Sequence, residues 1–361
     1  MPASASTVGV EEEFLLVDEH GRLAASGPEI TESVDDADGQ VEQELQRCQV
    51  ESATEVCVDV GDLVAGLRDL RDHLAAEAAR LGQRLLPSAT SPLADDRPPR
   101  FTPDGRYQRM SGEFGELARA ALTCACHVHV GIPDRESGLL ISNHIRPWLP
   151  SLLALAANSP FHDGVDTRYA SWRYEMCRRW PSAGPPPRFD STDDYESGVE
   201  GLMRSGAIMD RGMIYWDVRL SEHEPTVEIR IADVLPTVEH AALVAVLVRA
   251  LAGRAMDGSA AIGMSQEVLR GQLWRAARDG LSGRCVDPRS GDLVPTWELI
   301  DGLVDELRPY LLAAGDIDHV TATLARLRGE GGGAQRQRAV LAERGSLTAV
   351  IDSLAWHAAR P

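Results

Sequence analysis

The sequence of 361 residues contains no lysine, because all 36 of its basic residues are arginine. P-loop nucleotide binding and protein kinase catalysis each depend on a lysine, and Schiff-base catalysis depends on its amine. The sequence therefore excludes these three classes. It has only six cysteines, and no two of them have CxxC spacing. We expect reduced thiols and a cytoplasmic location.

Long apolar runs and an excess of positive charge are also missing. The longest apolar runs, such as residues 241–248, are too short to span a bilayer, and the first residues lack the pattern of a secretory signal. The formal net charge of −19 would repel phosphate backbones and anionic lipids. The sequence therefore predicts a protein that binds neither nucleic acid nor membranes.

The patterns that are present indicate an α+β protein. Its 43% hydrophobic content is ordinary for a globular chain, and no linker or repeat divides the sequence. We therefore expect residues 1–361 to form a single domain with a mainly antiparallel sheet. The expected strands are 7–18, 47–58, 124–132, 213–220 and 225–234, and the expected helices are 61–86, 136–157, 238–256 and most of the chain after 265.

The first predicted strand carries three consecutive glutamates, which are unusual in a strand. Alternation along the strand puts Glu11 and Glu13 on one face and Glu12 on the other, with the apolar residues. We expect Glu12 to face the helices and to pair there with an arginine. For Glu11 and Glu13, the strand alone allows either a solvated edge or a pair of carboxylates that bind a cation.

Three more predicted strands have an apolar face and a face with charged or metal-binding side chains. Their polar pairs are Gln49 and Glu51, His127 and His129, and Glu228 and Arg230. One such pair is more often ordinary surface, but four strands in one sheet would gather these groups together. Several carboxylates with imidazole suit Mg²⁺ or Mn²⁺ better than structural Zn²⁺, and a nearby arginine suits phosphate. The residues predict phosphoryl transfer from a nucleotide without a P-loop.

Six segments of the sequence resemble the signatures of the type 2 glutamate–cysteine ligases, the bacterial carboxylate–amine ligases, in the order typical of that family. They are VGVEEEFLLVD, CQVESAT, CHVHVGIPD, NSPFHDGVDTRYASWR, PTVEIRIADV and WRAARDGL. The resemblance implies a glutamine-synthetase-like catalytic domain, with a curved, mainly antiparallel sheet backed by helices. It implies an ATP-dependent ligase that forms an amide of the γ-glutamyl-cysteine type. ATP phosphorylates a carboxylate, an amine attacks the acyl phosphate, and ADP and phosphate are released.

The resemblance also assigns roles to individual residues. It implies two or three Mg²⁺ or Mn²⁺ ions, and the expected metal ligands are Glu11, Glu13, Glu51, His127 and Glu228. Arg230 falls at the position that steadies the transferring phosphate. The expected catalytic residues are therefore Arg230 and Glu228, and the expected nucleotide-binding residues are Arg230 and His129.

One segment departs from the family pattern, which commonly reads GRDTG where this chain reads GVDTR at residues 164–168. The usual arginine is replaced by Val165, and another appears at Arg168. Because this region is expected to shape the carboxylate pocket, Arg168 and Arg173 are candidate substrate-binding residues. Glu44 is a further candidate, because it precedes Glu51 by seven residues, as an acidic position does in related ligases. Either arginine could instead form a surface salt bridge. The expected substrates are L-glutamate and L-cysteine, with another acid or amine left open.

Two further interpretations are weaker. A metal-dependent hydrolase with an HxH motif usually has a (β/α)₈ barrel and often a carboxylated lysine, which this chain cannot supply. A non-catalytic relative would not need Glu11, Glu13 and Arg230 intact. The sequence leaves open whether identical chains associate.

Overall fold

The computed structural model describes residues 6–34, 41–98 and 100–357, and a sheet lies at its centre. The strands of this sheet are β1 (Val8–Val17), β2 (Val41–Gln43), β3 (Gln49–Ala53), β4 (Arg84–Leu86), β5 (Ala125–Gly131), β8 (Val218–Leu220) and β9 (Thr226–Asp233). Their order is β2–β3–β1–β5–β9–β8, and β4 also pairs with β1. Each of these pairings is antiparallel, as the sequence predicted.

Two small hairpins lie outside the central sheet. They consist of β6 (Phe161–His162) with β7 (Val165–Asp166), and β10 (Arg284–Val286) with β11 (Leu293–Pro295). The second hairpin interrupts the region that the sequence analysis took as helical after residue 265.

Helices surround the sheet. They are α1 (Gly27–Ser33), α2 (Val60–Arg80), α3 (Gly105–Phe114), α4 (Glu116–Arg119), α5 (Arg135–Ile145), α6 (Leu149–Ala156), α7 (Trp172–Cys177), α8 (Thr192–Arg204), α9 (Val238–Met256), α10 (Gln266–Asp279), α11 (Thr296–Ala314), α12 (Ile317–Glu330), α13 (Gly333–Arg344) and α14 (Leu347–Leu354). Short 3₁₀ turns are η1 (Arg146–Trp148), η2 (Arg211–Met213) and η3 (Gly280–Ser282). In the described part of the chain, no helix has both the length and the apolar character needed to cross a membrane.

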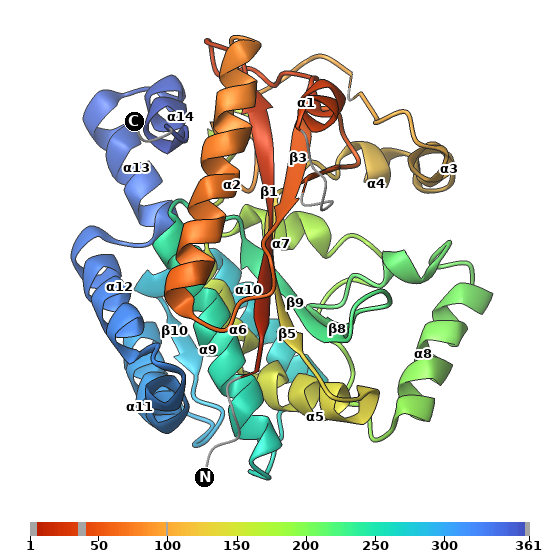
Figure 1. Ribbon diagram of the computed structural model, residues 1–361, viewed down its shortest axis with the longest axis vertical. Coiled ribbons are helices and arrows are strands. Elements are labelled where there is room, and N and C mark those ends of the chain that lie inside the picture. The colour runs from red at the N-terminus through yellow and green to blue at the C-terminus, as the bar shows by residue number, and fades with distance from the viewer. Residues whose placement is uncertain (1–5, 35–40, 99, 358–361) are drawn as a thin grey trace.

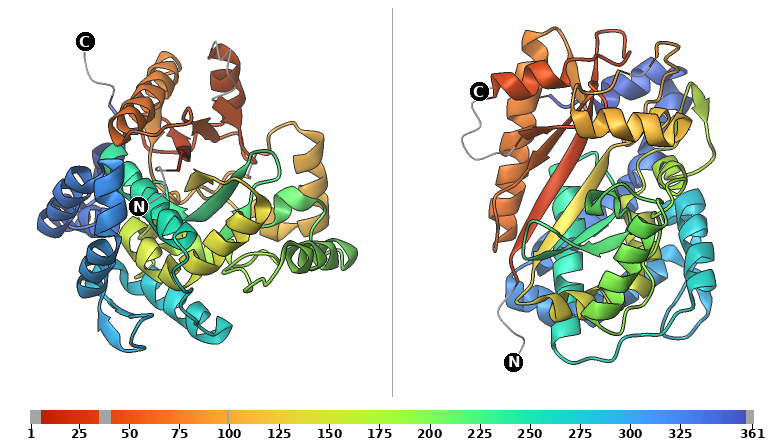
Figure 2. Two further views of the ribbon diagram at one scale, coloured as in Figure 1. Left: turned by 60° about the horizontal axis from the view of Figure 1, so that its bottom comes forward. Right: turned by 90° about the vertical axis from the view of Figure 1, so that its right-hand side faces the viewer.

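The apolar face of the sheet packs on α2, α6 and α9. Helix α9 contacts β1, β5 and α2, and α6 contacts β9. Figures 1 and 2 show α2 and α9 along one side of β1, whereas α3, α4 and α8 lie on the other side. Val10, Val128 and Ile229 are fully buried in this core, each at a stabilisation of about 1.5–3 kcal/mol. The apolar face thereby fixes which side of the sheet stays open.

Helix α9 shows how the sequence sets these boundaries. The Thr237 side chain accepts a hydrogen bond from the backbone N–H of His240 and so caps the helix. The following residues are apolar on nearly all sides, and most are buried. Such a helix needs covering all round, which the sheet, α2, α5 and α11 provide.

Glu12 and Arg71 form a buried ion pair between β1 and α2. Arg71 Nε donates to Glu12 Oε2 at 2.8 Å, and Nη2 donates to Oε1 at 2.5 Å. Arg71 Nη2 also donates to the carbonyl of Leu235 at 2.9 Å. The side chains are 0% and 1% exposed. The prediction that Glu12 faces the helices and pairs with an arginine is therefore confirmed.

Some predicted boundaries were wrong. The helix expected to continue to Leu86 ends at Arg80, because Gly82 has a φ of +70° and the chain then enters β4. The helix expected at 136–157 is interrupted by η1, which contains Pro147. In the strand expected at 213–220, only the part from Val218 pairs with β9.

Candidate active site

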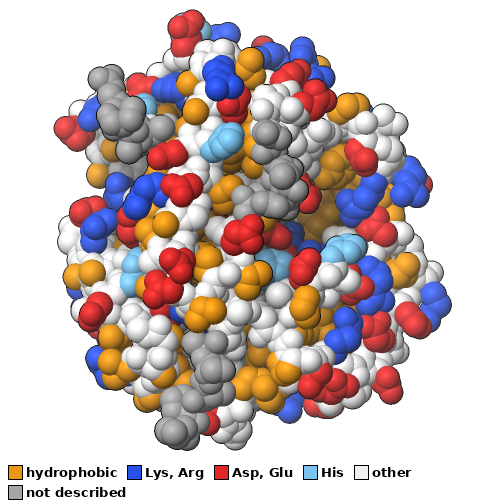
Figure 3. Space-filling view, in the orientation of Figure 1, with side chains coloured by type: hydrophobic (Ala, Val, Ile, Leu, Met, Phe, Trp, Pro, Cys, Tyr) orange, Lys and Arg blue, Asp and Glu red, His pale blue; other side chains and the backbone are white. Residues whose placement is uncertain are grey.

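A cleft of about 330 Å³ opens on the face of the sheet that does not contact α9. Its floor consists of polar side chains of β1, β3, β5 and β9, and its walls come from β2, α3, α7 and the segments 178–184 and 212–219. Figure 3 shows a hollow on the face seen in Figure 1, with acidic, basic and histidine side chains around it. Charge of both signs therefore lines one recess.

The antiparallel register brings the predicted polar residues together. Directly opposite residues on neighbouring strands point to the same face. The opposite pairs on the cleft face are Glu13 with Glu51, Glu11 with His127, and His129 with Glu228. The alternation seen in the sequence therefore becomes a continuous patch across four strands.

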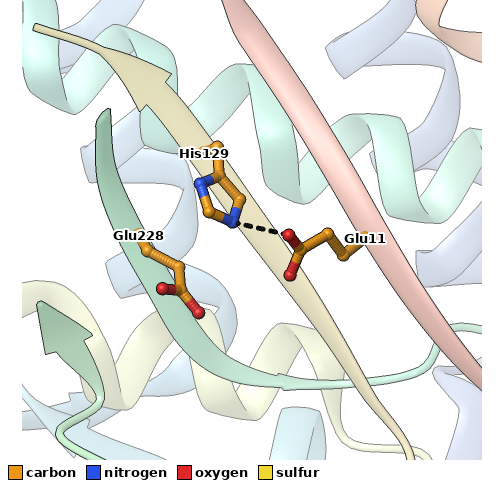
Figure 4. Close-up of side chains that lie close together, drawn as sticks. All are labelled: Glu11, His129 and Glu228. Carbon is orange, nitrogen blue, oxygen red and sulfur yellow. Dashed lines mark ion pairs between the residues drawn. The ribbon is translucent and has the colours of Figure 1, made fainter. Parts of the chain in front are cut away.

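Two overlapping groups of side chains could each hold a metal ion. One consists of Glu11, Glu51 and His127, and the other of Glu11, His129 and Glu228. Within each group the ligand atoms all lie within 4.8 Å of one another. Figure 4 shows Glu11, His129 and Glu228 converging from β1, β5 and β9. Glu11 belongs to both groups and thus lies between them.

Hydrogen bonds orient the two histidines of the cluster. His127 Nδ1 lies 3.1 Å from Glu11 Oε2, and His129 Nε2 lies 3.2 Å from Glu11 Oε1. His129 Nδ1 lies 2.8 Å from the hydroxyl of Thr226. Although burial opposes ionisation, these histidines hold the pKa of Glu11 well below its usual range.

Three other carboxylates of the cleft, those of Glu13, Glu44 and Glu51, resist ionisation. Burial, with the nearby charge of Glu44, raises the pKa of Glu13 to about 7. Burial and the charges of Glu44, Glu11 and Glu13 raise the pKa of Glu51 well above its usual range. Burial also raises the pKa of Glu44. A cation would remove this repulsion.

The residues fit a divalent metal. Carboxylate oxygens with imidazole nitrogens are the ligands that Mg²⁺ and Mn²⁺ sites use. His127 Nε2 is buried and makes no hydrogen bond to a described residue, and Glu13 Oε1 lies 3.7 Å from it. A buried ring nitrogen without a partner costs free energy that a bound ion would recover. Glu13 is adjacent to the two groups without belonging to either.

Five arginines line the cleft, namely Arg106, Arg173, Arg178, Arg219 and Arg230. Arg230 forms an ion pair with Glu228, and Arg219 Nε donates to the same carboxylate at 2.6 Å. Burial opposes ionisation of Glu228, but Arg230 and Arg219 keep its pKa well below the usual range. Arg173 is buried, and its Nε makes no hydrogen bond to a described residue. Asp233 lies 3.8 Å from its Nη1.

The candidate substrate-binding residues lie in different places. Glu44 and Arg173 line the cleft. Arg168 is exposed, has a φ of +65° and is not among the cleft residues, and its backbone N–H donates to Asp166. Val165, at the other departure from the family pattern, is 59% exposed.

Sequence reasoning missed several residues of the cleft. They are Arg106, Tyr107, Tyr215, Asp217 and Arg219. A signal was present in WDVRL, because alternation puts Asp217 and Arg219 on one face, as it does for Glu228 and Arg230. Arg106 and Tyr107 lie on α3, a helix that the sequence did not predict.

Comparisons with known proteins identify the family. The family described as "Glutamate-cysteine ligase family 2" matches residues 7–353. The "Putative glutamate--cysteine ligase 2-1" of Rhodococcus jostii (strain RHA1) is 50% identical over 353 residues, 96% of this chain and 95% of that protein. The "Putative glutamate--cysteine ligase 2-2" of Mycobacterium sp. (strain KMS) is 45% identical over 98% of both chains.

Two solved structures share the fold. The glutamate–cysteine ligase of Francisella tularensis, solved in complex with AMP, superposes with a TM-score of 0.74 at 14% identity, over 98% of this chain and 88% of that one. A bifunctional glutathione synthetase from Pasteurella multocida gives 0.71 at 16% identity, over 97% of this chain and 51% of that one. The predicted fold class is confirmed.

These matches place the chain in the class of ATP-dependent carboxylate–amine ligases, which use ATP and a divalent metal. Within that class, the chain belongs to glutamate–cysteine ligase family 2. The predicted family and type of enzyme are confirmed. The hydrolase interpretation is not favoured, because the central sheet is antiparallel rather than a (β/α)₈ barrel.

Proposed function

We propose that this enzyme joins L-glutamate to L-cysteine through an acyl phosphate, releasing ADP and phosphate. The observation that carries the proposal is the position of Arg230. Its guanidinium lies beside Glu228 in the same cleft as the carboxylate and histidine cluster. A cluster suited to bind metal ions is thus adjacent to an arginine suited to bind a phosphoryl group, as transfer of the γ-phosphoryl group requires.

We propose two Mg²⁺ (or Mn²⁺) ions that share Glu11. One would be held by Glu11, Glu51 and His127, and the other by Glu11, Glu228 and His129. The grouping of these ligand atoms supports this assignment. His129, expected from the resemblance to bind nucleotide, is thereby proposed as a metal ligand. When bound, the ions supply positive charge against the phosphates of ATP.

The predicted third ion and the role of Glu13 stay proposals. Glu13 lines the cleft beside Glu44, and Ala125 N donates to its Oε2 at 2.7 Å. This hydrogen bond holds one oxygen of the carboxylate. Its other oxygen, Oε1, lies on the side of His127. Glu13 is therefore proposed as a further ligand, with Glu44 near it.

The arginines divide between the phosphate and the acid. Arg230 is proposed to grip the transferring phosphoryl group, since its planar fork can bind two oxygens at once. Arg173, buried in the cleft wall with its Nε unbonded within the described residues, is proposed to bind a substrate carboxylate. The prediction for Arg168 has no support from its position, which is exposed and outside the cleft lining.

The position of the departure in sequence does not conflict with glutamate as the donor. Val165 and Arg168 are both exposed and outside the cleft lining, so they give no reason to replace glutamate as donor. A different acid or amine is the alternative, because small changes in a pocket can change the acceptor.

A screen for ADP release tests the proposal. Purified protein is incubated with ATP, Mg²⁺ and a matrix of carboxylic acids and amines. We expect ADP and phosphate with glutamate and cysteine together, and no turnover when the divalent metal is chelated. AMP and pyrophosphate as products would contradict the acyl phosphate mechanism. ADP formation with another pair would leave the chemistry intact and correct the substrates.

Two properties of the whole chain also remain proposals. We infer a single catalytic domain, supported by the family match over residues 7–353. A cytoplasmic location agrees with the unpaired state of all six cysteines. Size-exclusion chromatography with light scattering would show whether identical chains associate.

A further inference from the structure

Asp217 is a cleft carboxylate that belongs to neither group of candidate metal ligands. It immediately precedes β8, and the backbone N–H of Arg230 donates to its carbonyl at 2.9 Å. Since Val218 is paired with Ile229, the next positions, Asp217 and Arg230, are directly opposite each other. Both side chains therefore project from the cleft face of the sheet. Asp217 thus lies beside Arg230, which is proposed to hold the phosphate.

One oxygen of Asp217 is held and the other is free. The Tyr174 hydroxyl donates to Oδ2 at 3.0 Å. Tyr174 is itself 2% exposed, on a helix capped by Ser171. Oδ1 makes no hydrogen bond or ion pair with any residue that the structure describes, because Arg230 turns to Glu228 instead. Asp217 is thus oriented by one donor and left with one open acceptor.

This arrangement is costly unless a ligand completes it. Asp217 is only 6% exposed, and burial raises its pKa to about 7. A buried carboxylate without an ionic partner is unfavourable by comparison with a paired one. Asp233 shows the alternative, since its carboxylate accepts hydrogen bonds from Asn158 N and from the hydroxyls of Ser159 and Ser171. The open oxygen of Asp217 is typical of a residue that binds a ligand, whereas the fully bonded carboxylate of Asp233 is typical of a structural residue.

We propose that Asp217, oriented by Tyr174, receives the protonated amino group of a substrate; this rests on the proposed ligase function. An ammonium N–H needs one free carboxylate oxygen, whereas Mg²⁺ needs several oxygen ligands, which this position does not gather. Without the carboxylate of Asp217, the neighbouring arginines Arg173 and Arg230 would repel a substrate cation. The group held is the acceptor amine or the α-amino group of an amino-acid donor.

For the acceptor amine, the site also supplies a proton acceptor. The bound ammonium gives one proton to Oδ1 of Asp217, which frees the nitrogen lone pair. That pair forms the C–N bond to the acyl carbon, and the bond from this carbon to the phosphate oxygen breaks. The phosphate leaves with those electrons and takes the second proton from nitrogen. A carboxyl whose pKa is near neutrality suits this transfer.

The test compares Asp217→Asn with the wild type for two nucleophiles. Asparagine keeps an oxygen for Tyr174 but removes the charge. At neutral pH the amino group of cysteine is mainly an ammonium, whereas hydroxylamine is mainly uncharged. Hydroxylamine traps the acyl phosphate as a hydroxamate, which is detected as its coloured complex with ferric iron. Asp190→Asn, an exposed position outside the cleft, is the matched control. Tyr174→Phe should give a weaker form of the same effect.

If Asp217 holds the acceptor, Asp217→Asn should lower kcat/KM for cysteine by about 10²-fold or more and change hydroxamate formation by less than about tenfold. If it holds the donor's α-amino group, KM for glutamate should rise equally with both nucleophiles, and saturating glutamate should restore the rate. Either result supports the proposal and identifies the amino group.

Equal losses with both nucleophiles at saturating substrates, a changed requirement for metal, or no loss at all would each overturn the proposal. Hydroxamate formation by the variant shows that it is folded. If the wild type forms neither ADP nor hydroxamate with any acid, the proposed function has failed instead.

Discussion

At the scale of the residue, three consecutive glutamates of β1 have three different environments. Glu12 is paired with Arg71 in the helix layer, Glu11 lies beside His127 and His129, and Glu13 is buried near Glu44. Substitution of each glutamate should therefore change the stability of the folded protein differently. The same chemical change, glutamate to glutamine, therefore separates a structural carboxylate from the proposed metal ligands.

Glu12→Gln should destabilise the protein while most of the catalysis per folded molecule remains. Losing this charge leaves Arg71 buried and uncompensated, at a cost of about 3–5 kcal/mol. Urea denaturation monitored by circular dichroism measures the change, and kcat is measured well below the melting temperature. Glu12→Leu with Arg71→Met is the control, and it should recover much of the stability. A dead but fully stable Glu12→Gln variant would contradict this division of roles.

Glu13→Gln should abolish ligase activity yet raise the melting temperature of the metal-free protein above pH 7. The pKa of Glu13 is raised from 4.5 to about 7, so the folded state binds more protons than the unfolded state in that interval. Its stability therefore falls as the pH rises from about 4.5 to about 7. Removing the carboxylate removes this loss.

Glu11→Gln is the matched comparison, and it too should abolish activity. Its pKa is held low by His127 and His129, so its charge is favourable and the metal-free variant should melt earlier than the wild type. Equal shifts for the two variants in differential scanning fluorimetry would refute the distinction.

At the scale of the element, the edge formed by β8 and β9 determines which side chains face the cleft. Arg219 lies opposite Glu228, and Arg230 lies two residues farther along the same face of β9. A slip of β9 by one residue would turn Glu228 and Arg230 into the apolar core. The buried residues Ile229 and Ile231 oppose such a slip because they would become exposed.

Arg230→Lys should lower kcat by about 10²–10³, the scale expected for losing one preorganised donor. Lysine keeps the charge but loses the planar fork, so KM for ATP should change much less. Steady-state kinetics with a melting curve provide the measurement. Arg211→Lys, at an ion pair with Glu222 outside the cleft lining, is the control. If Arg230→Lys melts early but keeps a normal kcat, Arg230 merely supports the sheet.

At the scale of the whole molecule, the cleft gathers carboxylates and arginines within a chain that carries a formal net charge of −19. We expect this net charge to attract divalent cations and to repel ATP until a cation is bound. Protons compete with the metal for the same oxygens, so metal affinity and pH are coupled.

The affinity for Mg²⁺ or Mn²⁺ should therefore rise with pH up to at least about 7. Burial raises the pKa of Glu13 to about 7, so below that pH a metal must displace its proton. Each displaced proton makes the affinity change by about tenfold per pH unit. Titration calorimetry in two buffers of different ionisation enthalpy counts the protons released. An affinity that is constant between about pH 6 and about pH 8 would contradict the coupling.

The sequence by itself determined the faces of the strands. Side chains alternate with a period of two, so Glu11 and Glu13 had to lie opposite Glu12 wherever the strand was placed. The same local rule grouped His127 with His129 and Glu228 with Arg230. The family signatures then assigned expected roles to these residues and indicated the type of ligase.

The tertiary structure alone decided the partners across the chain. Arg71 is 59 residues from Glu12, and the pairing of Glu11 with His127 depends on the register of β1 against β5. Periodicity within one segment carries no information on register, because register depends on packing between segments. For the same reason, the exposed position of Arg168 and the free oxygen of Asp217 became visible only in the folded chain.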